Sequence, residues 1–255
     1  MGQLTEKIAD ILRVFSDTEN KRYFTSAVIL AAGSGRRFGQ EKGKKQFVPV
    51  CSVPALVHTL RAFEASSYIT EFVIVTGEED VRRCEEYCAE YGLKKLKAVV
   101  VGGDDRQTSA KRGFDAVSDA CEYVAIHDGA RCLVTPEMID RTVKAAYLEG
   151  AALAAEKSRD TVKRVSPSGK IEETVDRETV WLAKTPQVFM ANMYRAAIYT
   201  AAKDRFLGTD DSSLVERLGF KVAVVDCGSE NIKLTTPVDV HIAEAILRAR
   251  AGEEE

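Results

Sequence analysis

The segment from residue 27 to residue 47, AVILAAGSGRRFGQEKGKKQF, constrains the fold more than any other part of the chain. Its start, Val28–Leu30, is apolar on both faces, as expected of a strand in a parallel sheet that is covered on each side. Gly33 and Gly35 follow, and glycine permits positive φ and leaves backbone N–H groups accessible to an anion. The segment therefore predicts a buried strand that ends in a phosphate-binding loop.

Cationic side chains follow the glycines. They are Arg36, Arg37, Lys42, Lys44 and Lys45. The whole chain has a net charge of -3, so this cluster is a local feature and not part of a broad basic surface. A local cluster of this kind favours a small polyphosphate as ligand and argues against nucleic acid as the main partner.

Two familiar phosphate-binding loops do not fit this segment. The dinucleotide fingerprint is G-x-G-x-x-G, whereas Gly33, Gly35 and Gly39 are separated by one residue more. The Walker loop needs G-K-[ST], which does not follow here. Pro49 and Pro54 delay the next helical pattern, so the sequence predicts a long basic loop of another type.

Apolar patterns along the chain alternate between the strand period and the helix period. Strands are expected at 26–32, 71–76, 97–101, 122–127, 150–156 and 221–226. Helices are expected at 55–66, 79–91, 106–118, 136–149, 191–202 and 237–250. This alternation predicts an α/β fold with a Rossmann-like, mostly parallel sheet and helices on both faces. In such a fold, ligands bind beyond the carboxyl ends of the strands.

We place the main domain at 25–250, with one protruding segment inside these bounds and one further segment at each end of the chain. Residues 158–183 contain two short strand patterns around the turn Ser-Pro-Ser-Gly, and they predict a protruding β-hairpin arm. A lone hairpin is barely stable in water, so the arm is expected to pack on a partner. Residues 1–24 have apolar positions at helical spacing and predict a helical extension, and residues 251–255 form an acidic tail.

The remaining composition sets limits on location. No apolar run is long enough to span a membrane. Lys7, Asp10 and Arg13 interrupt any signal-peptide core. The six cysteines are scattered, and the pair Cys84 and Cys88 has no second pair to complete a metal site. The sequence therefore predicts reduced thiols, no protein-built metal site, no membrane partner and a cytoplasmic location.

Six motifs in order carry a resemblance to a known family. LAAGSGRRF followed by KKQF is similar to nucleotidyltransferases that join CTP to a sugar or polyol phosphate. The others are GGDDRQTS at 102–109, HDGAR at 127–131, TVDRETVWLAKTPQVF at 174–189, TDDSS at 209–213 and NIKLTTPVD at 231–239. Together they resemble the 2-C-methyl-D-erythritol 4-phosphate cytidylyltransferase family of the non-mevalonate isoprenoid pathway.

The resemblance implies an activity, a cofactor and an assembly. The enzyme would transfer CMP from CTP to 2-C-methyl-D-erythritol 4-phosphate, giving 4-diphosphocytidyl-2-C-methyl-D-erythritol and pyrophosphate. Mg²⁺ would be held mainly through the CTP phosphates. The chain would form a homodimer in which the arm at 158–183 embraces the second subunit.

The resemblance also implies site residues. Arg37, Lys45 and Lys233 would stabilise the transition state. The nucleotide would be bound by Ala31, Ala32, Gly33, Gly35, Arg36, Gly103, Asp104, Ser109, Asp128 and Gly129. The polyol phosphate would be bound by Asp128, Arg131, Thr161, Arg177, Thr185 and Lys233, with Thr161 and Arg177 reaching into the partner subunit's site.

Several of these residues have structural alternatives. Asp128 could cap the turn after its strand, and Arg177 could pair with a neighbouring carboxylate on the surface. Asp104 and Asp105 could be ordinary helix N-caps. Lys44 could take the place of Lys45 at the phosphates. Gly129 and Cys132 depart from the residues usual in the family at these two positions, an alanine and a proline.

Three other functions fit the sequence less well. Ribitol 5-phosphate cytidylyltransferase shares the glycine loop, but the string TVDRETVW favours the methylerythritol enzyme. A non-catalytic nucleotide-binding protein would not need Arg37, Lys45, Asp128 and Lys233 together. A dehydrogenase needs an acidic residue soon after the glycines, and Glu78 lies too far along the chain.

Overall fold

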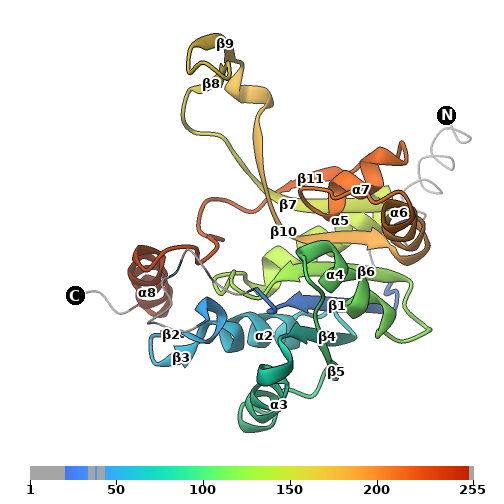
Figure 1. The fold of residues 1–255 in the computed structure, drawn as a ribbon. Helices are drawn as coiled ribbons and strands as arrows, with labels where there is room; N and C mark the ends of the chain where they lie inside the picture. The colour runs from blue at the N-terminus through green and yellow to red at the C-terminus, as the bar shows by residue number, and fades with distance from the viewer. Residues whose placement is uncertain (1–20, 34–37, 39–43, 253–255) are drawn as a thin grey trace, which may run out of the picture.

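The computed structural model describes residues 21–33, 38 and 44–252. Its centre is a seven-stranded sheet, drawn in Figure 1. The strand order is β11 (Ala223–Asp226), β7 (Ala151–Lys157), β10 (Trp181–Met190), β6 (Tyr123–Asp128), β1 (Thr25–Leu30), β4 (Glu71–Thr76) and β5 (Leu96–Val101). All neighbouring strands are parallel except β10, which runs antiparallel to both β6 and β7. The predicted mostly parallel sheet is confirmed.

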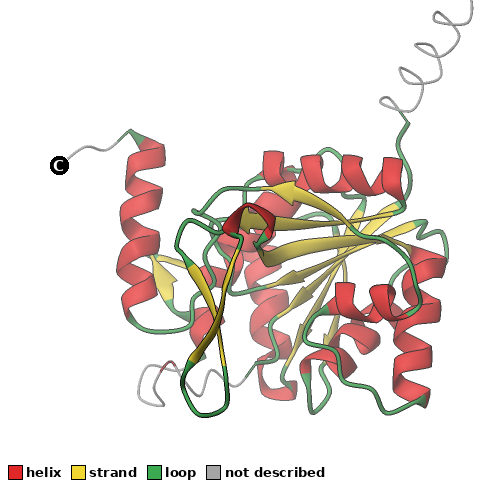
Figure 2. Ribbon diagram, turned by 90° about the horizontal axis from the view of Figure 1, so that it is seen from above, coloured by secondary structure: helices red, strands yellow, loops and turns green. Residues whose placement is uncertain are grey.

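Helices cover both faces of this sheet, as Figure 2 shows. The helices are α2 (Ala55–Ala65), α3 (Val81–Glu90), α4 (Arg106–Asp115), α5 (Pro136–Glu149), α6 (Ala191–Lys203), α7 (Asp211–Arg217) and α8 (Val238–Ala251). Ala27 and Ile29 of β1 pack with α2, α3 and α5, whereas Val28 packs with α4, α6 and α7. Successive residues of a strand point to opposite faces, so the apolar run of β1 fills two cores at once.

One strand of the central sheet and one α-helix were not expected from the sequence. Strand β10 contains Pro186, and proline removes a donor from the hydrogen-bond ladder. The pairing of β10 with β7 shifts register between Ala183 and Gln187, so the proline lies within an irregularity of the strand. Helix α7 has only seven residues, too few for a clear helical period.

The predicted hairpin is present. Strands β8 (Val162–Val165) and β9 (Ile171–Val175) form a separate two-stranded sheet that projects from the body in Figure 1. Gly169 closes the turn with φ +80, a conformation that glycine adopts without strain. A short 3-10 helix, η5 (Arg177–Thr179), follows on the return to β10.

A third, smaller core lies under helix α8. It joins α8 to strand β2 (Pro49–Val50), which pairs with β3 (Val53–Pro54), and Phe38 and Leu234 are buried in it. The predicted helical extension falls on residues 1–24, of which 1–20 lie outside the described residues, as do 253–255 of the acidic tail. No helix in the described part of the chain is long and apolar enough to cross a membrane.

Candidate active site

A cavity of about 600 Å³ opens at the carboxyl ends of β1, β5 and β6. This is the edge of the sheet at which ligands bind in open α/β folds. The predicted site residues that line it are Ala31, Ala32, Gly33, Lys45, Gly103, Asp104, Ser109, Asp128 and Lys233. Gly35, Arg36 and Arg37 lie outside the described residues.

Two glycine segments form part of the cavity wall. Gln46 is buried, and its Nε2 donates to the backbone oxygens of Ala31 and Gly33, so the KKQF motif is tied to the glycine loop. On the other segment, the Gly103 N–H donates to the Ser109 hydroxyl at 3.0 Å. A Cβ on Gly103 would come within 2.3 Å of the Thr108 side chain, so only glycine fits there. Both segments thus bring bare backbone to the cavity.

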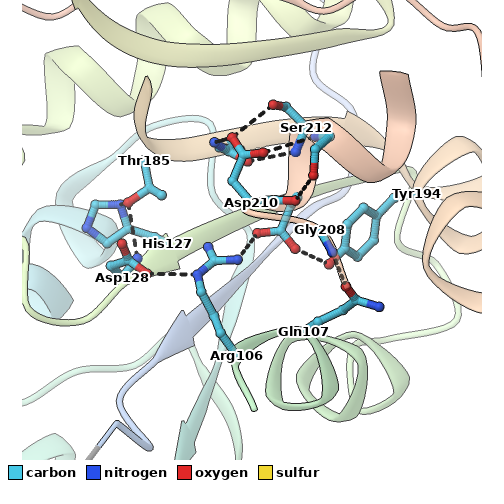
Figure 3. Close-up of polar contacts among 12 residues, drawn as sticks. Arg106, Gln107, His127, Asp128, Thr185, Tyr194, Gly208, Asp210 and Ser212 are labelled. Atoms are coloured by element: carbon cyan, nitrogen blue, oxygen red, sulfur yellow. Dashed lines mark hydrogen bonds and ion pairs between the residues drawn. The ribbon is translucent and has the colours of Figure 1, made fainter. Parts of the chain in front are cut away.

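Asp128 is the electrostatic centre of the described site. Its Oδ2 accepts from Lys233 Nζ at 2.7 Å, and its Oδ1 lies 3.3 Å from Arg106 Nε, as Figure 3 shows for Arg106. Arg131 Nε lies 3.7 Å from the same carboxylate. Burial alone would raise the pKa of Asp128, but the charges of Lys233, Arg106 and Arg131 outweigh it and hold the pKa well below its usual range. The carboxylate is therefore ionised at neutral pH and fixes cations on two sides.

Thr185 does not line the cavity. It is 4% exposed, and its hydroxyl accepts from the Asp128 backbone N–H at 3.1 Å and lies 3.0 Å from His127 Nδ1. This places its hydroxyl behind Asp128, where it holds the end of β6. That Thr185 meets the polyol phosphate stays a prediction.

Arg131 and Gly129 also lie outside the cavity lining. Arg131 is largely buried, and its Nη1 donates to the Asn231 backbone oxygen at 2.8 Å, close to the loop that carries Lys233. A Cβ on Gly129 would lie 3.1 Å from the Leu30 backbone oxygen, so this position is tightly packed against β1. Both residues support the strand ends that carry the site.

The structure distinguishes Lys44 from Lys45. Lys44 forms ion pairs with Glu79 and Asp80, at the start of the segment that leads into α3. Burial lowers the pKa of Lys44, but hydrogen bonds to Asp80 and Glu79 outweigh burial and raise it, so the ammonium stays charged and paired. Lys45 lines the cavity instead. The geometry favours Lys45 as the phosphate contact.

The arm residues are not brought to this cavity within one chain. Arg177 and Thr161 are both exposed. Arg177 Nη1 donates to the Arg159 backbone oxygen at 3.1 Å and lines a second cavity of about 360 Å³ at the base of the arm. Any role for them at an Asp128 cavity would have to be played at that of another subunit.

Sequence reasoning missed the polar residues that support the site. Arg106 bridges Asp128 and Asp211, Gln187 holds helix α7, and Asn231 Nδ2 donates to the Thr185 backbone oxygen. Each lies inside one of the family motifs GGDDRQTS, TVDRETVWLAKTPQVF, TDDSS and NIKLTTPVD. The motifs marked the right segments, but only three-dimensional contacts show which side chains face one another.

Comparison with known protein families gives a match over most of the chain. Residues 25–249 match the family model described as IspD, 2-C-methyl-D-erythritol 4-phosphate cytidylyltransferase. A protein of that name from Alkaliphilus metalliredigens (strain QYMF) is 40% identical over 235 residues, covering 90% of this chain and 95% of that protein. Another, from Caldanaerobacter subterraneus subsp. tengcongensis, is 43% identical over 225 residues, covering 88% of this chain and 98% of that protein.

Solved structures show the same similarity. The 4-diphosphocytidyl-2C-methyl-D-erythritol synthase of Anaerococcus prevotii DSM 20548 superposes with a TM-score of 0.80 at 30% identity, covering 89% of this chain and 96% of that one. The 2-C-methyl-D-erythritol 4-phosphate cytidylyltransferase of Thermus thermophilus superposes with a TM-score of 0.69 at 29% identity, covering 88% and 99%.

Proposed function

The chain belongs to the 2-C-methyl-D-erythritol 4-phosphate cytidylyltransferase family, and from this premise we propose the reaction of the Asp128 cavity. The enzyme transfers CMP from CTP to 2-C-methyl-D-erythritol 4-phosphate. The products are 4-diphosphocytidyl-2-C-methyl-D-erythritol and pyrophosphate, and the step belongs to isoprenoid precursor biosynthesis. The remaining proposals concern how this chain's residues perform that step.

The chemistry is an in-line displacement at phosphorus. A phosphate oxygen of the polyol phosphate forms a bond to the α-phosphorus of CTP, while the bond to the bridging oxygen breaks and pyrophosphate leaves with the electron pair. The attacking oxygen is already an anion, so no strong general base is required. His127 fits this view: it does not line the cavity, and burial lowers its pKa to about 3 in spite of the Asp128 charge beside it. Catalysis then rests on positioning and on charge stabilisation.

One observation carries the proposal: Lys233 and Lys45 line the same cavity as the Gly33 and Gly103 segments, with Lys233 fixed on Asp128. A cation that is already in place costs no reorganisation when charge develops on the α-phosphate. Lys45 acts from the glycine-loop side, and Lys233 from the opposite loop. Arg37, which the family resemblance also assigns to the transition state, lies outside the described residues.

We propose Mg²⁺ as the cofactor, held mainly by the triphosphate. The part of the chain that the structure describes contains no cluster of three or more candidate metal ligands among His, Cys, Asp and Glu. Asp104 lines the cavity as an exposed carboxylate, whereas both Asp128 oxygens lie close to cations. This donor set fits Mg²⁺, which keeps several waters and uses one or two carboxylates together with substrate phosphates. When bound, it would neutralise charge on the phosphate oxygens.

We also propose a homodimer in the cytoplasm. The arm carries exposed apolar side chains, among them Val165 and Ile171, and Trp181 and Leu182 at its base are exposed as well. Arg177 belongs to the family motif TVDRETVW, yet it lines the second cavity and not the Asp128 cavity of its own chain. In a dimer, Arg177 and Thr161 would hold the polyol phosphate of the partner's site. All six cysteines are free, which fits a reducing compartment.

Pyrophosphate release measured with purified protein tests the function. CTP with 2-C-methyl-D-erythritol 4-phosphate is expected to give rapid release, and UTP or ATP much slower release. Both polyol phosphates in one tube measure the ratio of specificity constants directly. A pocket that pairs the substrate hydroxyls rejects an analogue that leaves its polar groups unpaired, whereas one methyl group contributes only about 1–3 kcal/mol. A ratio in favour of ribitol 5-phosphate would reject the acceptor, and absence of release with any acceptor would reject catalysis.

A further inference from the structure

The TDDSS motif places a buried carboxylate outside the cavity. Asp211, the first residue of α7, is 1% exposed and does not line the cavity. Its Oδ1 accepts from the Tyr194 hydroxyl at 2.6 Å, and its Oδ2 accepts from Arg106 Nη1 at 2.6 Å. Burying a charge is costly unless it is paired and hydrogen-bonded. We therefore expect Asp211 to act through the side chains that it holds, Arg106 and Tyr194.

Arg106 connects this buried carboxylate to the site. It is the first residue of α4, lines the cavity and is about one-third exposed. Its Nη1 binds Asp211, while its Nε lies 3.3 Å from Asp128 Oδ1. Figure 3 shows the Arg106 side chain between Asp128 and Tyr194. One guanidinium can hold two carboxylates because its N–H groups form a rigid fork, which a lysine cannot reproduce.

Helix α7 is itself held in place. Asp210 caps it by accepting from the Ser213 N–H at 3.0 Å, and the second Asp210 oxygen accepts from Gln187 Nε2 at 2.8 Å. Gln187 Oε1 in turn accepts from the Ser212 N–H at 2.9 Å. Helix α7 is therefore fixed to strand β10, two residues after Thr185, and Asp211 presents a fixed anion to Arg106.

We propose that Asp211 is a positioning residue that holds Arg106 so that Arg106 secures one oxygen of Asp128 and leaves the other to Lys233. Tyr194 supports Asp211 from behind. The inference deepens the proposed function, since it assigns this motif to the setting of the Lys233 charge. Asp211 need not contact either substrate.

Charge balance explains what the loss of Asp211 would do. Asp128 and Asp211 carry two negative charges, and Arg106 and Lys233 carry two positive charges. Without the Asp211 charge, Arg106 is free to turn fully onto Asp128 or onto a bound triphosphate. In either case it competes with Lys233 for its place. Turnover then falls because Lys233 is misplaced, while the additional free cation still attracts CTP, so KM for CTP does not rise.

A double-mutant cycle tests this. The variants are Asp211→Asn, Arg106→Lys and the double variant, each assayed for kcat and KM. We expect kcat to fall about tenfold in Asp211→Asn and about thirtyfold in Arg106→Lys. In the double variant, kcat should be about thirtyfold below that of the wild type, the same as in Arg106→Lys alone. Independent sites would give a loss of roughly three-hundredfold. Additive losses, or a raised KM for CTP with unchanged kcat in Asp211→Asn, would overturn the proposal.

A matched control separates positioning from general stability. Glu71 is also a buried carboxylate, bonded to Ser26 and to Ser118, but it lies at the opposite, amino-terminal edge of the sheet. Glu71→Gln should lower the thermal midpoint yet leave kcat unchanged. Combined with Arg106→Lys, its effects on kcat and on the thermal midpoint should be additive. Thermal unfolding checks each variant.

A second variant keeps the test open if Asp211→Asn does not fold. Tyr194→Phe retains the Asp211 charge and should cost only about two- to threefold in kcat, again without adding to Arg106→Lys. Additivity there would also reject the proposal. Wild-type release of pyrophosphate tests the proposed function alone, and the cycle can be run with whichever acceptor the wild-type enzyme uses.

Discussion

Charged side chains are arranged differently in two regions, the arm at 158–183 and the cavity wall, by which we mean Asp128, Arg106, Lys233 and the residues packed behind them. In the wall, Asp128 contacts three cations, Arg106 contacts two carboxylates, and Asp211 is almost fully buried. In the arm, ion-paired side chains are exposed, as Arg164 and Glu173 are. Contacts within one chain fix the charged side chains of the wall, whereas few contacts fix those of the arm.

This difference indicates which parts of the site one chain can organise in advance. Exposed ion pairs contribute about 0–1 kcal/mol, and an isolated two-stranded hairpin is marginal in water. The arm's order is therefore expected to come from packing on a partner. Buried, multiply bonded charges keep their geometry without a partner, which is what transition-state stabilisation requires.

The largest expected effect tests the wall itself. Lys45→Ala should lower kcat by about 100-fold or more, because it removes a cation placed at the developing phosphate charge. Lys44→Ala is the matched comparison: Lys44 is paired with Glu79 and Asp80, so its loss should cost less than about tenfold. Steady-state kinetics of both variants measure this directly. A larger loss for Lys44→Ala than for Lys45→Ala would exchange their roles.

The second test concerns the arm. Arg177→Ala should lower kcat/KM by about 30-fold if Arg177 holds the polyol phosphate of a neighbouring site, since a charge-assisted contact is lost. The fold should be unaffected, because Arg177 is exposed. Thermal unfolding serves as the control.

Complementation then shows whether Arg177 acts across subunits. Arg177→Ala and Lys45→Ala subunits are refolded together, so that each heterodimer contains one site with both native residues. An equal mixture should recover up to about a quarter of wild-type activity, because half of the dimers are mixed and each has one intact site. Light scattering that shows a monomer, or no recovery in proven heterodimers, would remove the arm from the site and erase the contrast with the wall.

Features that depend on neighbours in the chain could be predicted from the sequence, whereas features that depend on contacts between distant residues could not. Apolar periodicity is local, so the strands and helices around Val28 and Ile29 could be identified from neighbours in the chain. Strand β10 was missed because Pro186 breaks the expected pattern and lies in a register shift that only pairing with β7 reveals.

The site was predicted to a similar limit. The resemblance of the motifs to the family singled out Asp128, Lys233 and Lys45, and all three line the cavity. The motifs could not show that Thr185 faces inward to His127, or that Arg106 meets Asp211, a residue more than one hundred positions away. Such pairs depend on tertiary packing, which no single-sequence pattern encodes.

His127 provides a test of whether the protein behind Asp128 excludes water and charge. It is fully buried, lies 3.0 Å from the Thr185 hydroxyl through Nδ1, and has a ring 4.9 Å from that of Phe63. Its Nε2 has no hydrogen-bond partner among the described residues. Burial therefore lowers its pKa to about 3, although the Asp128 charge opposes the shift. The imidazole is neutral in the folded protein throughout the physiological range.

The smallest expected effect is a change in the pH dependence of stability. Well above the ordinary histidine pKa of about 6.5, His127 is neutral in both the folded and the unfolded chain, so it adds no pH dependence there. Below that value the unfolded chain takes up a proton that the folded protein refuses, so the free energy of unfolding falls as pH decreases toward 3. Between pH 7 and pH 5.5 this should cost about 1.3 kcal/mol in the wild type and nothing at this position in His127→Gln. Urea unfolding at several pH values measures the difference, and His58, whose pKa burial also lowers, is present in both proteins and cancels. Equal pH slopes would mean that the imidazole can be protonated in the folded protein, and that burial at this position does not exclude charge.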